Sequence, residues 1–266
     1  MYQTTYHRAA SVSDAVKHLK KSDDAKLVSG GMTLIPAMKT RLAAPADLVD
    51  LRHIPEMRGI AVSGKTVTIG AATTHAEVAT DARIAKACPA LSHLASHIGD
   101  PHVRHMGTIG GSIANNDPAA DYPAAMLALD AIIVTNKRET PAGKFFKGLF
   151  ETALKEDEII TAVTFTVPAK SGYEKFPNPA SRYAMTGVFV AKGKDGVRAA
   201  VTGAGEDGVF RSGEIEAALS KKFEPAALEG VSVPSDDLMT DIHASAEYRA
   251  NLVVVMAKRA VVRANA

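Results

Sequence analysis

Cysteine is almost absent from this sequence: Cys88 is the only one among 266 residues. A single thiol cannot form an internal disulfide, and it cannot supply the several thiolates that hold an iron–sulfur cluster. The sequence therefore suits a reducing compartment. Any iron–sulfur cluster that works with this chain must lie on another polypeptide.

The sequence also lacks an excess of either positive or negative charge. The 31 Lys and Arg residues nearly balance the 29 Asp and Glu residues, which gives a formal net charge of +2, and no long basic run occurs. This balance disfavours a nucleic-acid partner or an anionic membrane surface. No apolar run reaches the length of a transmembrane segment, and the N-terminus MYQTTYHRAASV lacks the basic start and apolar block of a signal peptide. We expect a cytoplasmic protein.

Several catalytic patterns are missing too. The sequence has no G-x-S-x-G motif and no Ser-His-Asp order, so we expect no hydrolytic chemistry. Four histidines crowd around Asp100, but they match no H-E-x-x-H motif and have no Cys partner, and Pro101 breaks the helix that carries them. These histidines are His93, His97, His102 and His105. We interpret them as surface and loop residues and predict no metal site.

What the chain does contain is a polar, glycine-rich stretch, GTIGGSIANNDPAADYP, from Gly107 to Pro123. Its polarity argues against a core segment. Adjacent glycines let backbone N–H groups approach a ligand without an intervening Cβ, and Thr108, Ser112, Asn115 and Asn116 offer side-chain hydrogen bonds to phosphate or ribose oxygens. The stretch is typical of a nucleotide-binding loop. An ordinary Gly-Gly turn followed by an Asn-Asp-Pro loop is the alternative.

A second element of the same kind, KLVSGGMTLIPAMKTR, occurs earlier in the chain. Leu27 and Val28 are predicted to end a short buried strand, Ser29-Gly30-Gly31 to form a tight turn, and residues 33–41 to form a helix. A strand, a turn and a helix N-terminus direct free N–H groups and a positive dipole end to one point, which suits a pyrophosphate. Neither G-x-G-x-x-G nor G-x-x-x-x-G-K-S/T is present, so a Rossmann domain and a P-loop are disfavoured. A connection that needs glycine only for steric reasons is the alternative.

The rest of the N-terminal two thirds alternates between helical and strand patterns. Ser11 is a candidate helix N-cap, Ser63-Gly64-Lys65 a hairpin turn, and Thr73 or Thr74 the cap of a following helix. The predicted strands span residues 2–7, 48–51, 131–135 and 160–167, and the predicted helices span residues 76–98, with a stop at Pro89, and 122–129.

The composition changes after Pro168. AKSGYEKFPNPASR is rich in Pro, Gly and Ser, which predicts a linker or a crossing between domains, with a boundary near Lys170. Beyond it, two short strands are expected around a Lys-Asp-Gly turn, followed by an amphipathic helix at EIEAALS. The chain is expected to end in a long helix, EYRANLVVVMAKRAVVRA, with a broad apolar face.

Together, these motifs resemble a known family. SGGMTLIP and TIGGSIANNDPAAD are similar to the two flavin loops of the FAD-binding medium subunit of the molybdenum hydroxylases, the group that contains aerobic carbon monoxide dehydrogenase and xanthine dehydrogenase. PHVRHMGTIGG resembles the lead-in to the second loop, and KFPNPASRYAMTGVFVA resembles the start of the C-terminal domain. VTGAGEDGVFR and SAEYRANLVVVMAKRAV resemble the last two landmarks of that domain. With PHVRHMGTIGG and the second loop that it leads into counted as one, these five landmarks occur in the family's order and extend over nearly the whole chain.

The resemblance implies an α+β fold. A two-subdomain FAD-binding domain of the PCMH (vanillyl-alcohol-oxidase-like) type is expected in residues 1–170, and a smaller α+β domain of the CO dehydrogenase flavoprotein type in residues 171–266. The implied protein is an oxidoreductase subunit whose FAD passes electrons from the 2Fe-2S clusters of a small partner subunit to an external acceptor. Substrate would be oxidised on a large molybdopterin-binding subunit, in a dimer of heterotrimers.

The resemblance also implies a set of cofactor-binding residues. The two loops would hold the pyrophosphate and the ribityl chain, while Asp117 and Asp121 would meet the adenosine ribose and neighbouring polar groups. Ile98 would press on the isoalloxazine ring, Ile160 would line the adenine or flavin pocket, and Lys175 would approach the pyrimidine edge. The full set is Leu27, Val28, Ser29, Gly30, Gly31, Met32, Thr33, Leu34, Ile98, Thr108, Gly110, Gly111, Ser112, Asp117, Asp121, Ile160 and Lys175.

Two other functions stay open. A stand-alone FAD-dependent oxidoreductase of the PCMH fold would act on a small alcohol or a cell-wall precursor, but the sequence shows no candidate for its substrate base. The second alternative is a chain that binds no cofactor and only bridges partner proteins. The sequence does not discriminate between carbon monoxide, an aldehyde, a purine or another N-heterocycle as the upstream substrate, or between a quinone, NAD and dioxygen as the acceptor.

Overall fold

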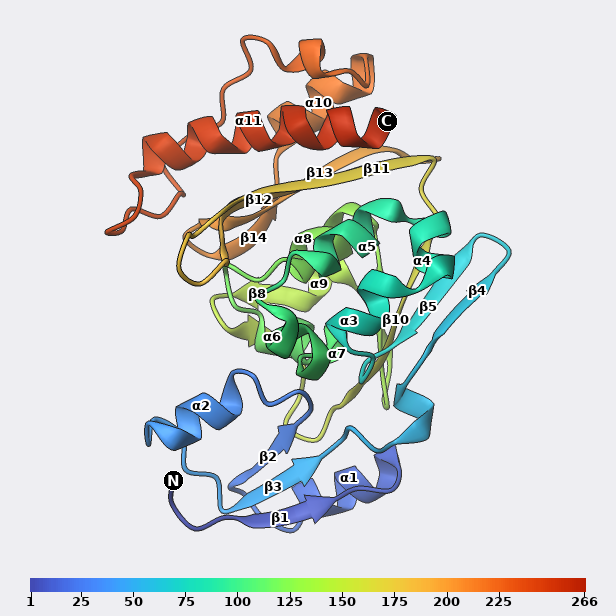
Figure 1. Cartoon of the computed structure of the whole chain (residues 1–266), viewed down its shortest axis with the longest axis vertical. Coiled ribbons are helices and arrows are strands. Elements are labelled where there is room, and N and C mark those ends of the chain that lie inside the picture. The colour runs from blue at the N-terminus through green and yellow to red at the C-terminus, as the bar shows by residue number, and fades with distance from the viewer.

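A computed structural model describes all residues, 1–266, and arranges them in three stacked layers (Figure 1). A small N-terminal layer lies at one end, a central layer combines a sheet with several short helices, and a C-terminal sheet covered by a long helix lies at the other end. The chain runs through these layers in order from the N-terminus to the C-terminus.

The first layer is a three-stranded parallel sheet with strand order β1-β3-β2. It consists of β1 (Thr5–Arg8), α1 (Val12–Leu19), β2 (Ala25–Val28), α2 (Leu34–Lys39) and β3 (Asp47–Asp50). Ser11 caps α1 by accepting a hydrogen bond from the Asp14 backbone N–H, as the sequence predicts. The predicted first strand is an edge strand, although it starts three residues later than expected.

The central layer contains a five-stranded sheet with strand order β4-β5-β10-β6-β7. Its strands are β4 (Ile60–Ser63), β5 (Thr66–Gly70), β6 (Ile132–Thr135), β7 (Glu139–Pro141) and β10 (Ile160–Thr166). The predicted hairpin is confirmed, because Ser63 pairs with Thr66 and Gly64 adopts the left-handed conformation that such a turn requires, with φ 59°. The 3-10 helix η1 (Pro55–Met57) leads into this sheet, and a small ladder of β8 (Phe146–Gly148) and β9 (Glu151–Thr152) flanks it.

Short helices cover this sheet. They are α3 (His75–Thr80), α4 (Ala82–Ala87), α5 (Pro89–Ser96), α6 (Pro101–Met106), α7 (Ile109–Asn115), α8 (Tyr122–Ala128) and α9 (Ala142–Phe145). The helical region predicted over residues 76–98 divides into three helices. Thr74 closes a capping box with Glu77, and Asp81 accepts hydrogen bonds from the backbone N–H groups of Arg83 and Ile84. The break at Pro89 is as predicted, whereas the Asp81 cap adds a division that periodicity alone does not indicate.

The C-terminal layer is a four-stranded antiparallel sheet, β11 (Lys170–Pro177), β12 (Ala184–Gly193), β13 (Gly196–Gly205) and β14 (Gly208–Arg211). The long helix α11 (Ala246–Asn265) covers its outer face together with α10 (Gly213–Lys221) and the 3-10 helix η2 (Pro225–Leu228) (Figure 1). Of the two predictions for residues 169–182, a linker or a crossing between domains, the linker is wrong for residues 170–177, because β11 pairs along its length with β12. Gly172 lies where α11 crosses the strand, and a Cβ there would be 1.9 Å from the Ala260 carbonyl oxygen. Gly172 is therefore required by the close packing of α11 on β11, and it does not indicate a linker.

Two large hydrophobic cores and a small third cluster of Val28, Met38 and Leu48 stabilise the molecule. The larger core joins the first two layers to the inner face of the C-terminal sheet through Tyr173 and Phe189. The smaller core lies between the outer face of that sheet and α11, around Val253 and Met256. Cys88 is buried in the larger core. None of the helices combines the length and apolar character needed to cross a bilayer.

Candidate functional site

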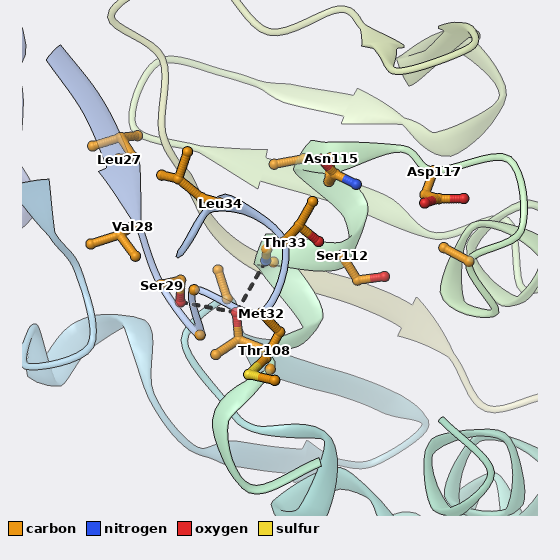
Figure 2. Close-up of a pocket in the computed structure, with 18 of the residues that line it drawn as sticks. Leu27, Val28, Ser29, Met32, Thr33, Leu34, Thr108, Ser112, Asn115 and Asp117 are labelled. Atoms are coloured by element: carbon orange, nitrogen blue, oxygen red, sulfur yellow. Dashed lines mark hydrogen bonds between the residues drawn. The ribbon is translucent and has the colours of Figure 1, made fainter. Parts of the chain in front are cut away.

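The two glycine turns, far apart in sequence, lie side by side (Figure 2). The Ser29 and Thr108 hydroxyl oxygens are 2.9 Å apart and share a hydrogen bond. Gly30 packs directly on the second turn, since a Cβ there would lie 2.3 Å from the Met106 carbonyl oxygen and 2.5 Å from Gly107 Cα. A side chain at residue 30 would therefore separate the turns.

Both turns line one cavity of about 770 Å³, which extends between the first layer, the central layer and the loop before β12. This volume lies within the range of about 300–1,000 Å³ that is typical of ligand and cofactor sites. All of the candidate residues except Lys175 line it. Ile98 and Ile160 contribute apolar walls, and Ser112, Asn115 and Asp117 lie along one side (Figure 2).

The first turn carries unused hydrogen-bond donors. The backbone N–H groups of Ser29, Gly30, Gly31, Met32 and Thr33 donate to no acceptor in the chain, although all five residues line the cavity. The Thr33 side chain does not cap α2 either, so the N-terminus of that helix keeps its free donors. Such a row of N–H groups next to a helix N-terminus is the donor set that a diphosphate requires. The residues present therefore fit the phosphate part of a dinucleotide.

The second turn differs from the sequence-based expectation. It begins α7, and its N–H groups are already occupied: Ile109 donates to Thr73 O, Gly110 to Ala71 O, and Gly111 to the Thr108 hydroxyl. A Cβ at Gly110 would lie 2.5 Å from the Ala71 side chain, so this glycine, which also lines the cavity, allows close packing of two chain segments. The second turn instead offers the Ser112 hydroxyl and the Asn115 amide, which form no hydrogen bond within the chain and lie at the cavity (Figure 2).

Asn116 has a structural role rather than the predicted ligand contact. Its side-chain amide donates to the carbonyl oxygens of Gly148 and Glu151, at 2.8 and 2.9 Å, and the residue is buried. It ends α7 in the left-handed conformation, with φ 44°, which Asn adopts more readily than most residues. Asn116 therefore ties α7 to the β8–β9 ladder.

Asp121 and Lys175 form a buried ion pair, with Lys175 Nζ 2.9 Å from the carboxylate and side-chain exposures of 5 % and 4 % for Lys175 and Asp121. The Tyr173 hydroxyl donates to the same carboxylate. Burial raises the pKa of Asp121 above its ordinary value, and the Lys175 charge and the Tyr173 hydrogen bond act against that rise. Gly187 makes room for this group, because a Cβ there would lie 2.7 Å from the Tyr173 hydroxyl oxygen.

This ion pair joins two residues that the resemblance assigned separately. Asp121, with Asp117, was expected at the adenosine ribose and neighbouring polar groups, and Lys175 at the pyrimidine edge of the flavin. The structure brings the two side chains into contact. Lys175 itself lines a second, neighbouring cavity.

His75 is a buried residue of the cavity wall that the sequence did not single out as a contact. Its Nδ1 has no hydrogen-bond partner, and its ring lies 5.3 Å from that of Tyr122, whose hydroxyl is also unpartnered. Burial, with a smaller contribution from the nearby Arg104 charge, lowers the pKa of His75 to about 4. The ring is therefore neutral at pH 7.

Other lining residues come from segments with no local signal. Arg182 and Tyr183 lie in the loop between β11 and β12, and Leu154 lies after β9. Their sequence surroundings suggest a linker or a loop, and only the folded chain brings them to the cavity. The four clustered histidines do not converge: the tilted rings of His93 and His97 lie 4.1 Å apart at the end of α5, and His105 bonds Pro101 O on α6. No three His, Cys, Asp or Glu side chains are grouped as metal ligands.

Comparison with known proteins identifies the family. Residues 2–169 match the model of the FAD binding domain in molybdopterin dehydrogenase. The chain is 34 % identical to the carbon monoxide dehydrogenase medium chain of Hydrogenophaga pseudoflava, over 96 % of this chain and 95 % of that one. It is also 34 % identical to the nicotine 6-hydroxylase medium subunit of Paenarthrobacter nicotinovorans, over 98 % and 97 %. Among solved structures, a chain of the reconstituted CO dehydrogenase from Oligotropha carboxidovorans superposes with a TM-score of 0.88 at 33 % identity, covering 99 % of this chain and 98 % of that one.

These similarities confirm the α+β flavoprotein fold that the sequence predicts. They agree with the free donors of the first glycine turn in pointing to a dinucleotide, and they establish FAD as that dinucleotide. The chain belongs to the FAD-binding medium subunits of the molybdenum hydroxylases and is an oxidoreductase component.

Proposed function

We propose that the first glycine turn holds the FAD diphosphate through the five free N–H groups of residues 29–33. This observation carries the proposal, because none of the five donors has a protein partner and those of Ser29, Gly30 and Gly31 lie in the partly buried half of the turn. The Thr33 hydroxyl on the same turn supplies a further hydrogen bond, and the Ser112 hydroxyl and the Asn115 amide supply others from the opposite wall. Leu27, Val28, Met32 and Leu34 flank the turn, while Thr108, Gly110 and Gly111 keep the second turn in place beneath it.

The ring system takes the far part of the cavity. In this arrangement Ile98 and Ile160 pack on the flavin or the adenine, and Asp117, whose pKa burial raises, lies beside the ribityl or ribose hydroxyls. Lys175 and Asp121 lie together at the pyrimidine end. Bound FAD supplies the redox chemistry of the subunit, and the chain binds it, orients it and sets the charge around it.

We also propose the partners and the organisation of the complex. The chain would work with a large molybdopterin-binding subunit and a small 2Fe-2S subunit, as a dimer of heterotrimers in the cytoplasm. The names of the relatives support this proposal, since they are medium chains or medium subunits. Within the chain, residues 1–170 would form the FAD-binding domain and residues 171–266 the C-terminal domain, a division supported by the start of β11 at Lys170.

The test places a negative charge on the cavity wall. Ser112→Asp puts a carboxylate where the Ser112 hydroxyl faces the cavity, and Ser112→Asn is a neutral control of the same size. We expect Ser112→Asp to lose most of its FAD, because like charges repel strongly in a partly desolvated site, and Ser112→Asn to retain much more. FAD per chain is measured by absorbance after purification, and circular dichroism checks the fold. Equal FAD content in the two folded variants would contradict the proposed diphosphate position.

Co-purification decides between the main proposal and a stand-alone oxidoreductase. Affinity capture of the tagged chain from its native cells should recover a molybdenum-containing subunit and an iron–sulfur subunit in equal amounts. A flavin-loaded chain that is recovered alone, and that oxidises a small alcohol, would favour the stand-alone enzyme.

A further inference from the structure

A second cavity, of about 470 Å³, adjoins the FAD cavity. It lies between α5, α6 and β11 with its following loop, and it shares Gly99 and Arg182 with the larger cavity. Of its 12 lining residues, one is hydrophobic. The polar and charged residue types of this lining suit a hydrophilic ligand.

The charges of this cavity do not cancel. Lys175 is neutralised by Asp121, and Glu174 is neutralised by Arg263. Arg104 and Arg182 remain, and neither forms an ion pair with a carboxylate. Two unpaired guanidinium groups therefore line the same small cavity.

Both arginines converge on one atom. Arg104 Nη1 donates to the Gly99 carbonyl oxygen at 3.1 Å and to the Ile98 carbonyl oxygen at 3.1 Å, and Arg182 Nη1 lies 3.4 Å from the same Gly99 oxygen. A guanidinium group has five N–H donors, so each arginine keeps donors free. Asp100, next to Gly99 in the chain, caps α6 by accepting a hydrogen bond from the Val103 N–H; this bond is the main cause of its lowered pKa, and the Arg182 charge contributes.

The loop that carries Arg182 is closed by its own hydrogen bonds. Asn178 N–H donates to Tyr183 O, and Arg182 N–H donates to Asn178 O, both at 2.8 Å. Arg182 adopts a left-handed conformation with φ 64°, which is uncommon for a side chain of this size. The loop thus presents Arg182 at the wall between the two cavities.

We propose that this second cavity binds the anionic group of the external electron acceptor, a hydrophilic molecule that bears a phosphate or a carboxylate held by Arg104 and Arg182. The proposal rests on the proposed position of FAD in the adjoining cavity, because the shared wall at Gly99 and Arg182 would bring such a molecule next to the flavin. The planar fork of arginine matches the oxygens of a phosphate or a carboxylate. His93 adds no positive charge at pH 7, since burial lowers its pKa to about 4.

The first experiment measures anion binding in the FAD-loaded chain. Inorganic pyrophosphate is titrated at constant ionic strength, and binding is followed by the flavin difference spectrum and by calorimetry. We expect saturable binding at one site, weakened about tenfold or more by Arg104→Gln or Arg182→Gln, because each removes charge-assisted hydrogen bonds. Arg259→Gln, which removes an exposed arginine on α11 that forms no ion pair, is the matched control and should bind pyrophosphate as the wild type does.

The second experiment tests the link to the acceptor. The flavin is reduced photochemically without oxygen, and its reoxidation is followed with 1,2-naphthoquinone or with its 4-sulfonate, which have the same ring and differ in charge. We expect reoxidation by the sulfonate to saturate at lower concentration than by the neutral quinone. This preference should fall about tenfold in Arg104→Gln or Arg182→Gln and persist in Arg259→Gln.

The outcomes separate this proposal from the proposed function. Purification of the wild type without FAD would contradict the FAD site itself. Two results would overturn the acceptor site and leave the FAD site intact. One is an FAD-loaded wild type that shows no saturable pyrophosphate binding. The other is a preference for the sulfonate that survives in either FAD-loaded arginine variant. If one arginine variant loses its FAD, the other, FAD-loaded variant decides whether the acceptor site is correct.

Discussion

The buried pair of Asp121 and Lys175 gives the sharpest prediction about stability. In Asp121→Asn the Lys175 ammonium, 5 % exposed, loses its only carboxylate. Breaking a buried pair by removing one partner costs about 3–5 kcal/mol, whereas an exposed pair contributes about 0–1 kcal/mol. We therefore expect Asp121→Asn to lower the free energy of unfolding by about 3–5 kcal/mol.

Lys175→Met and the double variant complete a double-mutant cycle, which measures the interaction energy between Asp121 and Lys175 apart from their other contacts. Lys175→Met leaves Asp121 with the Tyr173 hydrogen bond, and the double variant removes both charges. We expect the double variant to be more stable than Asp121→Asn, with a coupling energy of about 2–3 kcal/mol. Urea unfolding at pH 7, followed by far-ultraviolet circular dichroism on samples of known FAD content, measures all four free energies. A cost below about 1 kcal/mol for Asp121→Asn would refute the reasoning, because it would show that the pair is solvated.

Three further predictions concern the turns and the cavity wall. Asn116→Ala should lower the free energy of unfolding, measured by urea titration, by about 2–4 kcal/mol, because two carbonyl oxygens lose their donor. The folded fraction should keep its FAD, and loss of FAD without loss of stability would contradict the structural role of Asn116. Gly30→Ala should lower both the melting temperature and the FAD content, since its Cβ would lie 2.3 Å from Met106 O, and an unchanged melting temperature would show that the turns do not touch. His75 has a folded-state pKa of about 4, below its ordinary 6.5, so the unfolded chain binds more protons than the folded chain between these pH values. The free energy of unfolding should therefore fall as the pH drops from 6.5 towards 4, by about 3 kcal/mol in all. His75→Phe should remove this part of the pH dependence of urea unfolding, and a variant with the same pH profile as the wild type would contradict the lowered pKa.

Local sequence patterns predict much of the fold. The hairpin at Gly64, the capping box at Thr74 and the long helix α11 follow from turn chemistry, capping and apolar periodicity, all of which act over a few residues. The strand β11 was missed because its Gly172 and Pro177, with Pro179 just beyond it, resemble a linker. In the structure Gly172 is required by the crossing of α11, a contact between segments far apart in sequence.

The same distinction applies to the site. The sequence identifies both glycine turns, but it does not reveal which of them has free donors, because the N–H groups of α7 are occupied by Ala71 and Thr73, residues of another segment. It identifies Asp121 and Lys175 separately and misses their contact. It offers no signal for Tyr183, which reaches the cavity only through the path of the loop before β12. Tertiary contacts decide these features, and no local pattern encodes them.

The central claim is that the N–H groups of residues 29–33 hold the FAD diphosphate. Amide hydrogen exchange, measured residue by residue on the FAD-loaded chain and on the same chain after FAD removal, tests it directly. The account predicts that these five amides exchange rapidly without FAD and become strongly protected with it, while Ile109, Gly110 and Gly111 are protected in both states because the protein already occupies them. Unchanged exchange at residues 29–33 on loading with FAD, or new protection confined to α7, would contradict the account.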